Sequence, residues 1–401
     1  MKTNYLIASV LIVVSFLTSC ETDDTADIIF NDNSIDNSTT NNGSNEEETG
    51  NLVVNIGGTM TSDLTLETDT DYLLTEGLIM TEGTTLTIPA GTVIKANSGA
   101  DVYVAISQGA EINAVGTAGS PIVFTSNSNT PNAGDWGGLI ILGKAPINSV
   151  AGGEATSTSE IGGLPYGGSN ESDNSGIIKY VRIEYSGGSA DASSENNGFS
   201  FYGVGNGTTV EYIQAFEGKD DGIEFFGGTV NANFISVIGA QDDSVDWTEG
   251  YRGTLNNVYI EHGVSHDKGI EADGFNTDIG NNSNPLYFSK PTISNVLIIG
   301  RGSATENEAI RLRAGTQGIF TNIVIQGFEE GFDIDGDGGN SPTGQGVANG
   351  DLQVTDVTFI DVIQKVKNDT SVPFTDSEFM SGDGNAFETD YFTWGAVWTR
   401  N

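Results

Sequence analysis

The chain of 401 residues is poor in cysteine and proline. Its single cysteine, Cys20, excludes an internal disulfide, so burial and backbone hydrogen bonds must stabilise the fold. Proline occurs 9 times against 54 glycines, and no segment keeps the apolar periodicity of a helix. This combination predicts an all-β protein with many tight turns.

Positive charge is also scarce, with 15 Lys and Arg residues against 55 Asp and Glu residues. The formal net charge of −40 disfavours nucleic acid, anionic lipid headgroups and polyanionic sugars as partners, unless cations bridge them. We therefore expect no nucleic-acid partner. The same balance suits a domain that is held off a surface or that binds calcium.

The apolar run at residues 5–17 is too short to span a bilayer. Together with Lys2 before it and small residues after it, the run predicts a signal peptide over residues 1–19. Residues 17–20 (Leu-Thr-Ser-Cys) resemble a bacterial lipobox, which implies lipidation of Cys20 and attachment to a membrane. The alternative is an ordinary signal peptide that happens to contain a cysteine.

Residues 20–50 predict a lipidated, disordered tether, because this stretch is acidic, lacks Lys and Arg, and cannot bury enough apolar surface to fold. The acids Glu21, Asp23 and Asp24 resemble the surface-export signal of Bacteroidota lipoproteins, which implies display on the outer membrane. Beyond the tether we expect a folded domain over 51–365 and a capping or covering segment over 366–401.

An internal repeat predicts the architecture of the folded domain. A first strand of polar, apolar, any and apolar residues recurs, as in Asn257–Ile260, and a second strand follows, as in Asp221–Phe225. Middle copies lie 22 to 25 residues apart, which matches one coil of a β-solenoid and is too short for a propeller blade. The second strands predict one internal column, formed by Phe199, Ile223, Val245, Ile270, Ile310 and Phe332.

Three segments, Thr87–Ile94, Pro121–Thr125 and Gly134–Ile140, resemble a group of Bacteroidota lipoproteins that is mostly uncharacterised. The resemblance covers the chain from about Leu64 to the C-terminus. It implies a right-handed parallel β-helix of the pectate-lyase-like kind. It implies little about activity, because this fold hosts enzymes, adhesins and binding proteins alike.

Acidic residues dominate the outward positions of the second strand. Neighbouring coils are about 4.8 Å apart, so such carboxylates lie side by side and repel each other or recruit a cation. This predicts a face that binds calcium or a neutral glycan through Glu224, Asp246 and Glu271, and the alternative is a solvated outer face. The outward positions are Ser200, Glu224, Asp246, Glu271, Arg311 and Asp333.

A second acidic motif combines Asp333, Asp335 and Asp337 with Gly336, like the first half of a calcium loop. Gly344 stands where an EF-hand needs glutamate, so an EF-hand is excluded. A simpler calcium-binding turn and a plain acidic turn both remain open, and calcium is the one cofactor that the sequence suggests.

A possible catalytic set consists of Asp221, Asp243, His266 and Arg311. Aspartate doublets, a His-Gly pair and an Arg-x-Arg motif resemble the polygalacturonase-type inverting glycoside hydrolases, which work through two carboxylates. The sequence departs from that pattern, because Asn276-Thr277-Asp278 follows the histidines and Arg313 replaces the final lysine.

The first strands carry an apolar row on positions that we expect to face outward, and the row includes Phe216, Ile235, Tyr259 and Leu297. Such a row is either covered or docks a partner. The aromatic C-terminal segment predicts a cover from within the chain. Its rings are alternatively a platform on which sugars stack.

These features favour a non-catalytic surface lipoprotein that binds a glycan or another outer-membrane component. A carbohydrate-active enzyme is the first alternative, and a passive scaffold or adhesin is the second. Placement of Asp221, Asp243 and His266 in one open groove would favour the enzyme.

Overall fold

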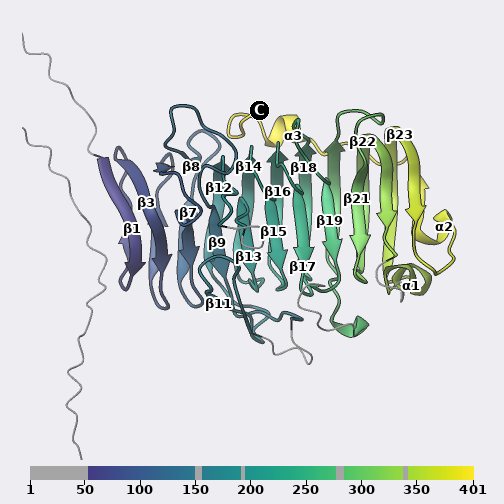
Figure 1. Cartoon of the computed structure of the whole chain (residues 1–401), viewed down its shortest axis with the longest axis horizontal. Coiled ribbons are helices and arrows are strands. Elements are labelled where there is room, and N and C mark those ends of the chain that lie inside the picture. The colour runs from purple at the N-terminus through teal and green to yellow at the C-terminus, as the bar shows by residue number, and fades with distance from the viewer. Residues whose placement is uncertain (1–52, 150–155, 191–194, 277–283, 337–341) are drawn as a thin grey trace, which may run out of the picture.

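The computed structural model describes residues 53–149, 156–190, 195–276, 284–336 and 342–401. Cys20, the signal peptide and the tether of the sequence analysis lie outside these ranges. The described chain winds into one long solenoid whose coils follow each other along the axis from β1 to β23 (Figure 1). It is a right-handed parallel β-helix, as predicted.

Each complete coil contributes one strand segment to each of three faces, and each face is a parallel β-sheet. In one coil, face 1 holds Thr209–Glu211, face 2 holds Ile213–Phe216 and face 3 holds Ile223–Phe226. The first and second strands of the predicted repeat form faces 2 and 3. Face 1 was not predicted, because its residues continue directly into face 2 within one bent strand. The strands are β1 (Val53–Met60), β2 (Leu64–Thr65), β3 (Asp71–Met80), β4 (Thr85–Ile88), β5 (Val93–Ala96), β6 (Val104–Ile106), β7 (Glu111–Val115), β8 (Ile122–Ser126), β9 (Leu139–Leu142), β10 (Ser157–Thr158), β11 (Pro165–Tyr166), β12 (Gly176–Glu184), β13 (Phe199–Tyr202), β14 (Thr209–Phe216), β15 (Ile223–Phe226), β16 (Asn231–Ile238), β17 (Val245–Thr248), β18 (Thr254–Glu261), β19 (Ile270–Asp273), β20 (Thr292–Ile299), β21 (Glu308–Arg313), β22 (Gly318–Ile334), β23 (Leu352–Asn368) and β24 (Met380–Asp383).

The core is the interior of the solenoid, where equivalent apolar residues of successive coils stack. Burying each apolar face against its neighbours is what makes the repeat stable. The predicted internal column is confirmed, because its members are in register and at most 1% exposed. They are Phe199, Ile223, Val245, Ile270, Ile310 and Phe332.

The corner between face 1 and face 2 is a column of residues with positive φ. Asparagine adopts this left-handed conformation more easily than most residues, and Asn257, Asn295 and Asn322 occupy the corner in three coils. Asn322 Nδ2 donates to Asn295 Oδ1 at 2.8 Å, which links neighbouring coils. In earlier coils the corner is aromatic, and the rings of Tyr212 and Phe234 stack 4.2 Å apart.

The corner corrects one prediction about the apolar row. Phe234 occupies the corner, so Ile235 pairs with Ile213 and points into the core with 0% exposure. The prediction that Ile235 faces outward is wrong. Phe234 takes the corner position that asparagine holds in later coils, so the repeat in this coil starts one residue later than predicted. Ser236 takes the outward position instead.

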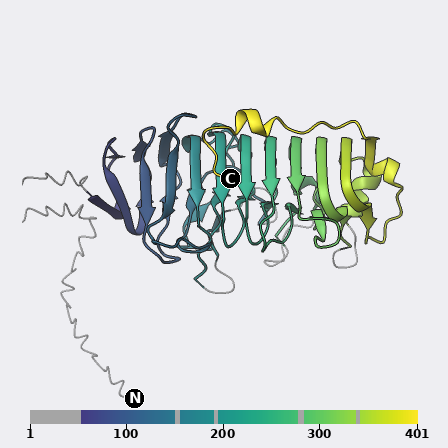
Figure 2. The same cartoon turned by 90° about the horizontal axis from the view of Figure 1, so that it is seen from above.

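The C-terminal segment runs back along the outside of face 2 from the far end of the solenoid (Figure 2). Its short helix α3 (Tyr391–Trp394) places Tyr391 flat on Tyr259, with ring centroids 3.6 Å apart. Trp398 meets the edges of the aromatic corner and is fully buried. The covering role predicted for this segment is therefore confirmed.

The remaining helices lie beside the solenoid. The single turn η1 (Pro285–Tyr287) belongs to an insertion between β19 and β20. Helices α1 (Pro342–Asn349) and α2 (Asp376–Phe379) pack at the last coil, whose strand β23 continues beyond the expected boundary at residue 365. Within the described ranges, no helix has both the length and the hydrophobicity to cross a bilayer.

Candidate functional site

An acidic cleft lies on the outer side of face 3. It forms because three successive coils each present an outward acid on the face 3 strand and one or two acids in the turn just before that strand. The coils stack in register, so these carboxylates from separate parts of the sequence meet. The cleft is lined by Glu160, Glu195, Asp220, Asp221, Glu224, Asp242, Asp243, Asp246, Asp267, Lys268, Glu271, Arg311 and Arg313.

Two buried aspartates hold the successive turns of the cleft together. Asp221 Oδ1 accepts the backbone N–H of Asp243 at 2.9 Å, and Asp243 Oδ1 accepts that of Lys268 at 2.7 Å. The two residues are 7% and 5% exposed. Among the described residues, the second oxygen of each carboxylate has no hydrogen-bond or ion-pair partner, and it belongs to the lining of the cleft.

Positive charge neutralises one end of the cleft only. Glu271 lies 2.5 Å from Arg313, 3.4 Å from Lys268 Nζ and 3.7 Å from Arg311. At the other end, Glu224 accepts a hydrogen bond from Asn197 at 2.7 Å, which is a neutral partner. Among the described residues, Glu224 therefore has no cationic partner.

Burial and mutual repulsion raise the pKa values of the cleft carboxyls. Desolvation, followed by repulsion from Glu195 and Asp242, raises the pKa of Asp220 to about 8. Desolvation is also the leading reason why the pKa values of Asp221, Glu224, Asp243 and Asp246 lie well above the ordinary range. Such shifts in a cleft are typical of functional sites.

The cleft carboxylates can hold a cation. Asp221, Glu224 and Asp246 bring one oxygen each within 4.8 Å of the others, and Asp243, Asp246 and Glu271 do the same. Asp246 Oδ1 is buried without a hydrogen-bond partner among the described residues. Calcium takes 6 to 8 oxygen ligands at about 2.3–2.6 Å, so its chemistry fits a site built from carboxylates.

The proposed catalytic set is brought together only in part. Asp221, Asp243 and Arg311 line the cleft, but His266 is not part of its lining. The Nδ1 atom of His266 lies 3.1 Å from Oε2 of the buried Glu306 instead. Arg311 is also engaged, because its Nε and Nη2 atoms lie 3.0 and 2.5 Å from Asp335 Oδ2.

Of the second acidic motif, the structure describes Asp333 and Asp335. Asp335 is the ion-pair partner of Arg311, and Asp337 lies outside the described residues. Desolvation is the main cause that raises the pKa of Asp333 to about 6, while Lys367 opposes it. The carboxylate groups that the described chain gathers as possible metal ligands lie in the acidic cleft and at Glu306.

The apolar residues predicted as a partner face are covered by the chain itself. Tyr259 and Leu297 are each 2% exposed and belong to a small cluster with Val324 and Tyr391. Phe216 lies under the guanidinium of Arg400, 4.8 Å from its ring centroid. The C-terminal segment, rather than a partner, occupies this surface.

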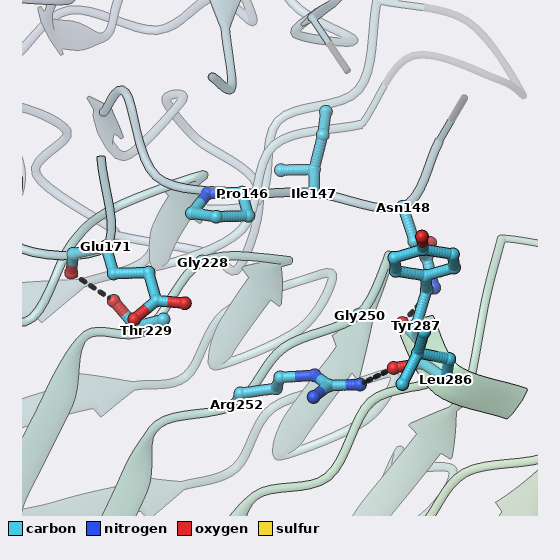
Figure 3. A pocket seen from close by; sticks show the side chains of 10 residues that line it. All are labelled: Pro146, Ile147, Asn148, Glu171, Gly228, Thr229, Gly250, Arg252, Leu286 and Tyr287. Atoms are coloured by element: carbon cyan, nitrogen blue, oxygen red, sulfur yellow. Dashed lines mark hydrogen bonds between the residues drawn. The ribbon is translucent and has the colours of Figure 1, made fainter. Parts of the chain in front are cut away.

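The sequence analysis missed a hollow of about 310 Å³ at the turns that follow face 3 (Figure 3). Two of its polar side chains donate hydrogen bonds within the hollow, whereas Asn148 Oδ1 is buried without a hydrogen-bond partner among the described residues. Arg252 donates to the carbonyls of Leu286 and Phe288, and Asn148 Nδ2 donates to the carbonyl of Tyr287 at 2.9 Å. The hollow therefore offers less unsatisfied polarity than the acidic cleft.

The fold and the cleft define a parallel β-helix with a charged groove on one face. A family model described as "Pectate-lyase like beta helix domain" matches residues 58–399, and the chain belongs to this family. No curated protein and no solved structure matches the chain significantly. A β-helix domain of this family suggests a carbohydrate-related role.

Proposed function

We propose that the protein is a lipid-anchored, non-catalytic β-helix that binds a neutral glycan through calcium in the acidic cleft. The observation that carries the proposal is the pair of buried, cleft-lining carboxylates, Asp221 and Asp243, each of which has one oxygen without a hydrogen-bond or ion-pair partner among the described residues. Buried charges in proteins are normally paired or coordinate a metal.

Calcium also explains how an acidic cleft could take a sugar. The part of the lining that the structure describes contains no aromatic ring on which a pyranose could stack. A calcium ion keeps ligand positions beyond those that a few carboxylates fill, and sugar hydroxyls are suitable oxygen donors for them. The ion would at the same time neutralise the uncompensated end of the cleft.

The anchor belongs to the same proposal. Lipidation of Cys20 and the acidic tether would hold the β-helix at the outer surface of an outer membrane. Mass spectrometry of the exported protein tests this part: the mature chain should begin at an acylated Cys20, and Cys20→Ala should abolish the acylation. An unmodified cysteine would overturn it.

Calorimetry with calcium and with neutral oligosaccharides tests the binding role. Asp243→Asn keeps the oxygen that accepts the Lys268 N–H and removes the charge. We expect calcium affinity to fall at least about tenfold and calcium-dependent sugar binding to be lost. The matched control is Asp351→Asn, an exposed acid paired with Lys290, which should bind as the wild type does. Equal binding by Asp243→Asn and the wild type would refute the proposal.

Glycoside hydrolysis is the second candidate, and the raised pKa values of neighbouring cleft carboxyls favour it. A carboxyl that stays protonated near neutral pH can act as general acid opposite a second carboxylate. A turnover assay on neutral glycans separates the two functions. Release of sugar that Asp243→Ala abolishes would establish the enzyme, whereas binding without turnover would support the binding protein.

A further inference from the structure

The only two histidines of the chain meet at one buried glutamate. His262 Nδ1 and His266 Nδ1 lie 3.0 and 3.1 Å from the same atom, Glu306 Oε2. The two imidazole rings stack with their centroids 4.6 Å apart. None of the three residues lines the acidic cleft, so this cluster is a separate feature of the molecule.

Two neighbouring coils build the cluster. The histidines lie in the turn between β18 and β19, and Glu306 lies in the corresponding turn between β20 and β21. The His262 backbone N–H donates to the Ile299 carbonyl at 3.0 Å, which ties one turn to the next coil. Glu306 Oε1 accepts the Arg301 N–H at 2.8 Å, so the carboxylate is oriented with Oε2 toward the histidines.

The side chains are buried, yet one edge is accessible. The side chains of His262 and Glu306 are 1% and 0% exposed, whereas that of His266 is 17% exposed. The other ring nitrogen of His262, Nε2, is buried without a hydrogen-bond partner in the described chain. The polar contact of that ring is therefore made at Nδ1, toward Glu306.

We propose that His262, His266 and Glu306 form a zinc site. Two imidazole nitrogens and one carboxylate oxygen are a frequent donor set for zinc, which binds them at about 2.0–2.2 Å. Donor atoms about 3 Å apart are close to the edge length of a coordination shell with such bonds. The side chain of His266 is 17% exposed, so this side of the cluster is in contact with solvent.

A metal here would act on the acidic cleft through the backbone. Asp267 and Lys268 line the cleft and directly follow His266 in the chain. Zinc bound between two turns would hold that turn against the next coil. The inference is independent of the proposed calcium site, since calcium prefers oxygen ligands and zinc accepts imidazole.

Zinc and cobalt titrations of the full chain, after removal of metals with a chelator, test the site. We expect one equivalent of Zn²⁺ to bind at the cluster and Co²⁺ to produce an absorption spectrum typical of nitrogen ligation. Glu306→Gln keeps the oxygen that accepts the Arg301 N–H, so the fold should be retained. Its zinc affinity should fall at least about 100-fold, because even residues outside the first coordination shell change affinity about 10–100-fold.

Two further variants keep the test decisive. His266→Ala changes a partly exposed side chain and should weaken zinc binding as strongly as Glu306→Gln does. Asp243→Asn alters the cleft alone and should leave zinc affinity within about twofold while weakening calcium binding. If Glu306→Gln binds zinc as the wild type does, or the wild type binds none, the trio is only a hydrogen-bonded cluster in which both rings donate to Glu306, and the proposal is refuted.

Discussion

Faces 2 and 3 of the β-helix are built from the same coils, but their outer sides are completed differently. On face 2 the outward residues include an apolar cluster, formed by Tyr259, Leu297 and Val324, and the chain covers it with its own C-terminal segment. On face 3 they are acidic, and the chain neutralises them at one end only, around Glu271. The first surface needs nothing more from outside, whereas the second keeps carboxylate oxygens without partners.

This difference indicates where a ligand is needed. Apolar side chains are satisfied by any apolar cover, so a flexible segment of the same chain suffices. Buried carboxylates require a charge or a hydrogen-bond donor for each oxygen. The uncompensated end of the cleft therefore points to a ligand from solution, while the covered apolar row does not.

The largest loss of stability is expected where the C-terminal segment is anchored on face 2. Trp398→Ala removes a fully buried ring that packs against Tyr180 and Tyr212, and should cost about 3–5 kcal/mol of unfolding free energy. Urea denaturation measures it, and binding of a hydrophobic dye should rise as face 2 opens. A matched control is Phe392→Ala, whose side chain is 71% exposed and should cost far less. Equal losses would mean that the segment is not a specific cover.

The next effect concerns the neutralised end of the cleft. Glu271→Gln removes a buried charge that contacts Lys268, Arg311 and Arg313, and should destabilise the protein by about 1.5–3 kcal/mol. Thermal unfolding at neutral pH measures the loss. An unchanged melting temperature would show that these ion pairs do not compensate the cleft.

The uncompensated end should make stability depend on pH. The pKa of Asp220 is raised from 3.8 to about 8, so between these values the folded state binds more protons than the unfolded state. Without calcium, stability should therefore fall as pH rises from about 4 to about 8, and level off above. Melting temperatures across this range measure the slope. Asp220→Asn should reduce the slope, to which the other cleft carboxyls also contribute, and a slope of opposite sign would contradict the assignment.

A smaller effect, a gain rather than a loss of stability, is expected when Asp246 is replaced. Its Oδ1 atom is buried without a partner, and its pKa is raised chiefly by desolvation. Without calcium at pH 8, Asp246→Asn should stabilise the protein by about 1 kcal/mol, because it removes repulsion among buried acids. Denaturant unfolding with and without calcium checks this: the gain should disappear when calcium is present. A loss of stability in both conditions would show that the charge is already compensated.

The smallest effect is expected at an exposed ion pair on the last coil. Lys365 and Asp383 pair with side chains 46% and 44% exposed. Asp383→Asn should change the unfolding free energy by no more than about 0.5 kcal/mol, because water screens such pairs. A loss comparable with that of Glu271→Gln would remove the contrast between exposed and buried charge on which the other predictions rest.

Much of the acidic cleft was predictable, because the regular repeat of the coils determines which residues line it. The alternation within Ile223–Phe226 assigns Glu224 to the outside, and the spacing of the coils brings Asp246 and Glu271 into line with it. The outward direction of the apolar row was harder to predict, because Phe234 occupies the left-handed corner position that asparagine occupies in later coils. A one-residue slip reverses every side chain, which is why Ile235 was assigned to the wrong side.

The histidine cluster could not be predicted in the same way. An insertion between β19 and β20 interrupts the period, so the spacing from His266 to Glu306 carries no regular signal. His266 was grouped with Asp243 because both precede face 3 strands in neighbouring coils. In the folded chain the ring turns toward Glu306 of the following coil and is not part of the cleft lining.

The sequence by itself determined the solenoid, its internal column and the acidic ladder, because these depend on short-range alternation repeated at a constant period. The tertiary structure alone decided which acids form ion pairs with Lys or Arg, where the C-terminal rings lie, and that the two histidines share Glu306. Those contacts join segments that are distant in sequence and follow no period. Their geometry is therefore set by how whole coils and the returning segment pack, and no local pattern encodes it.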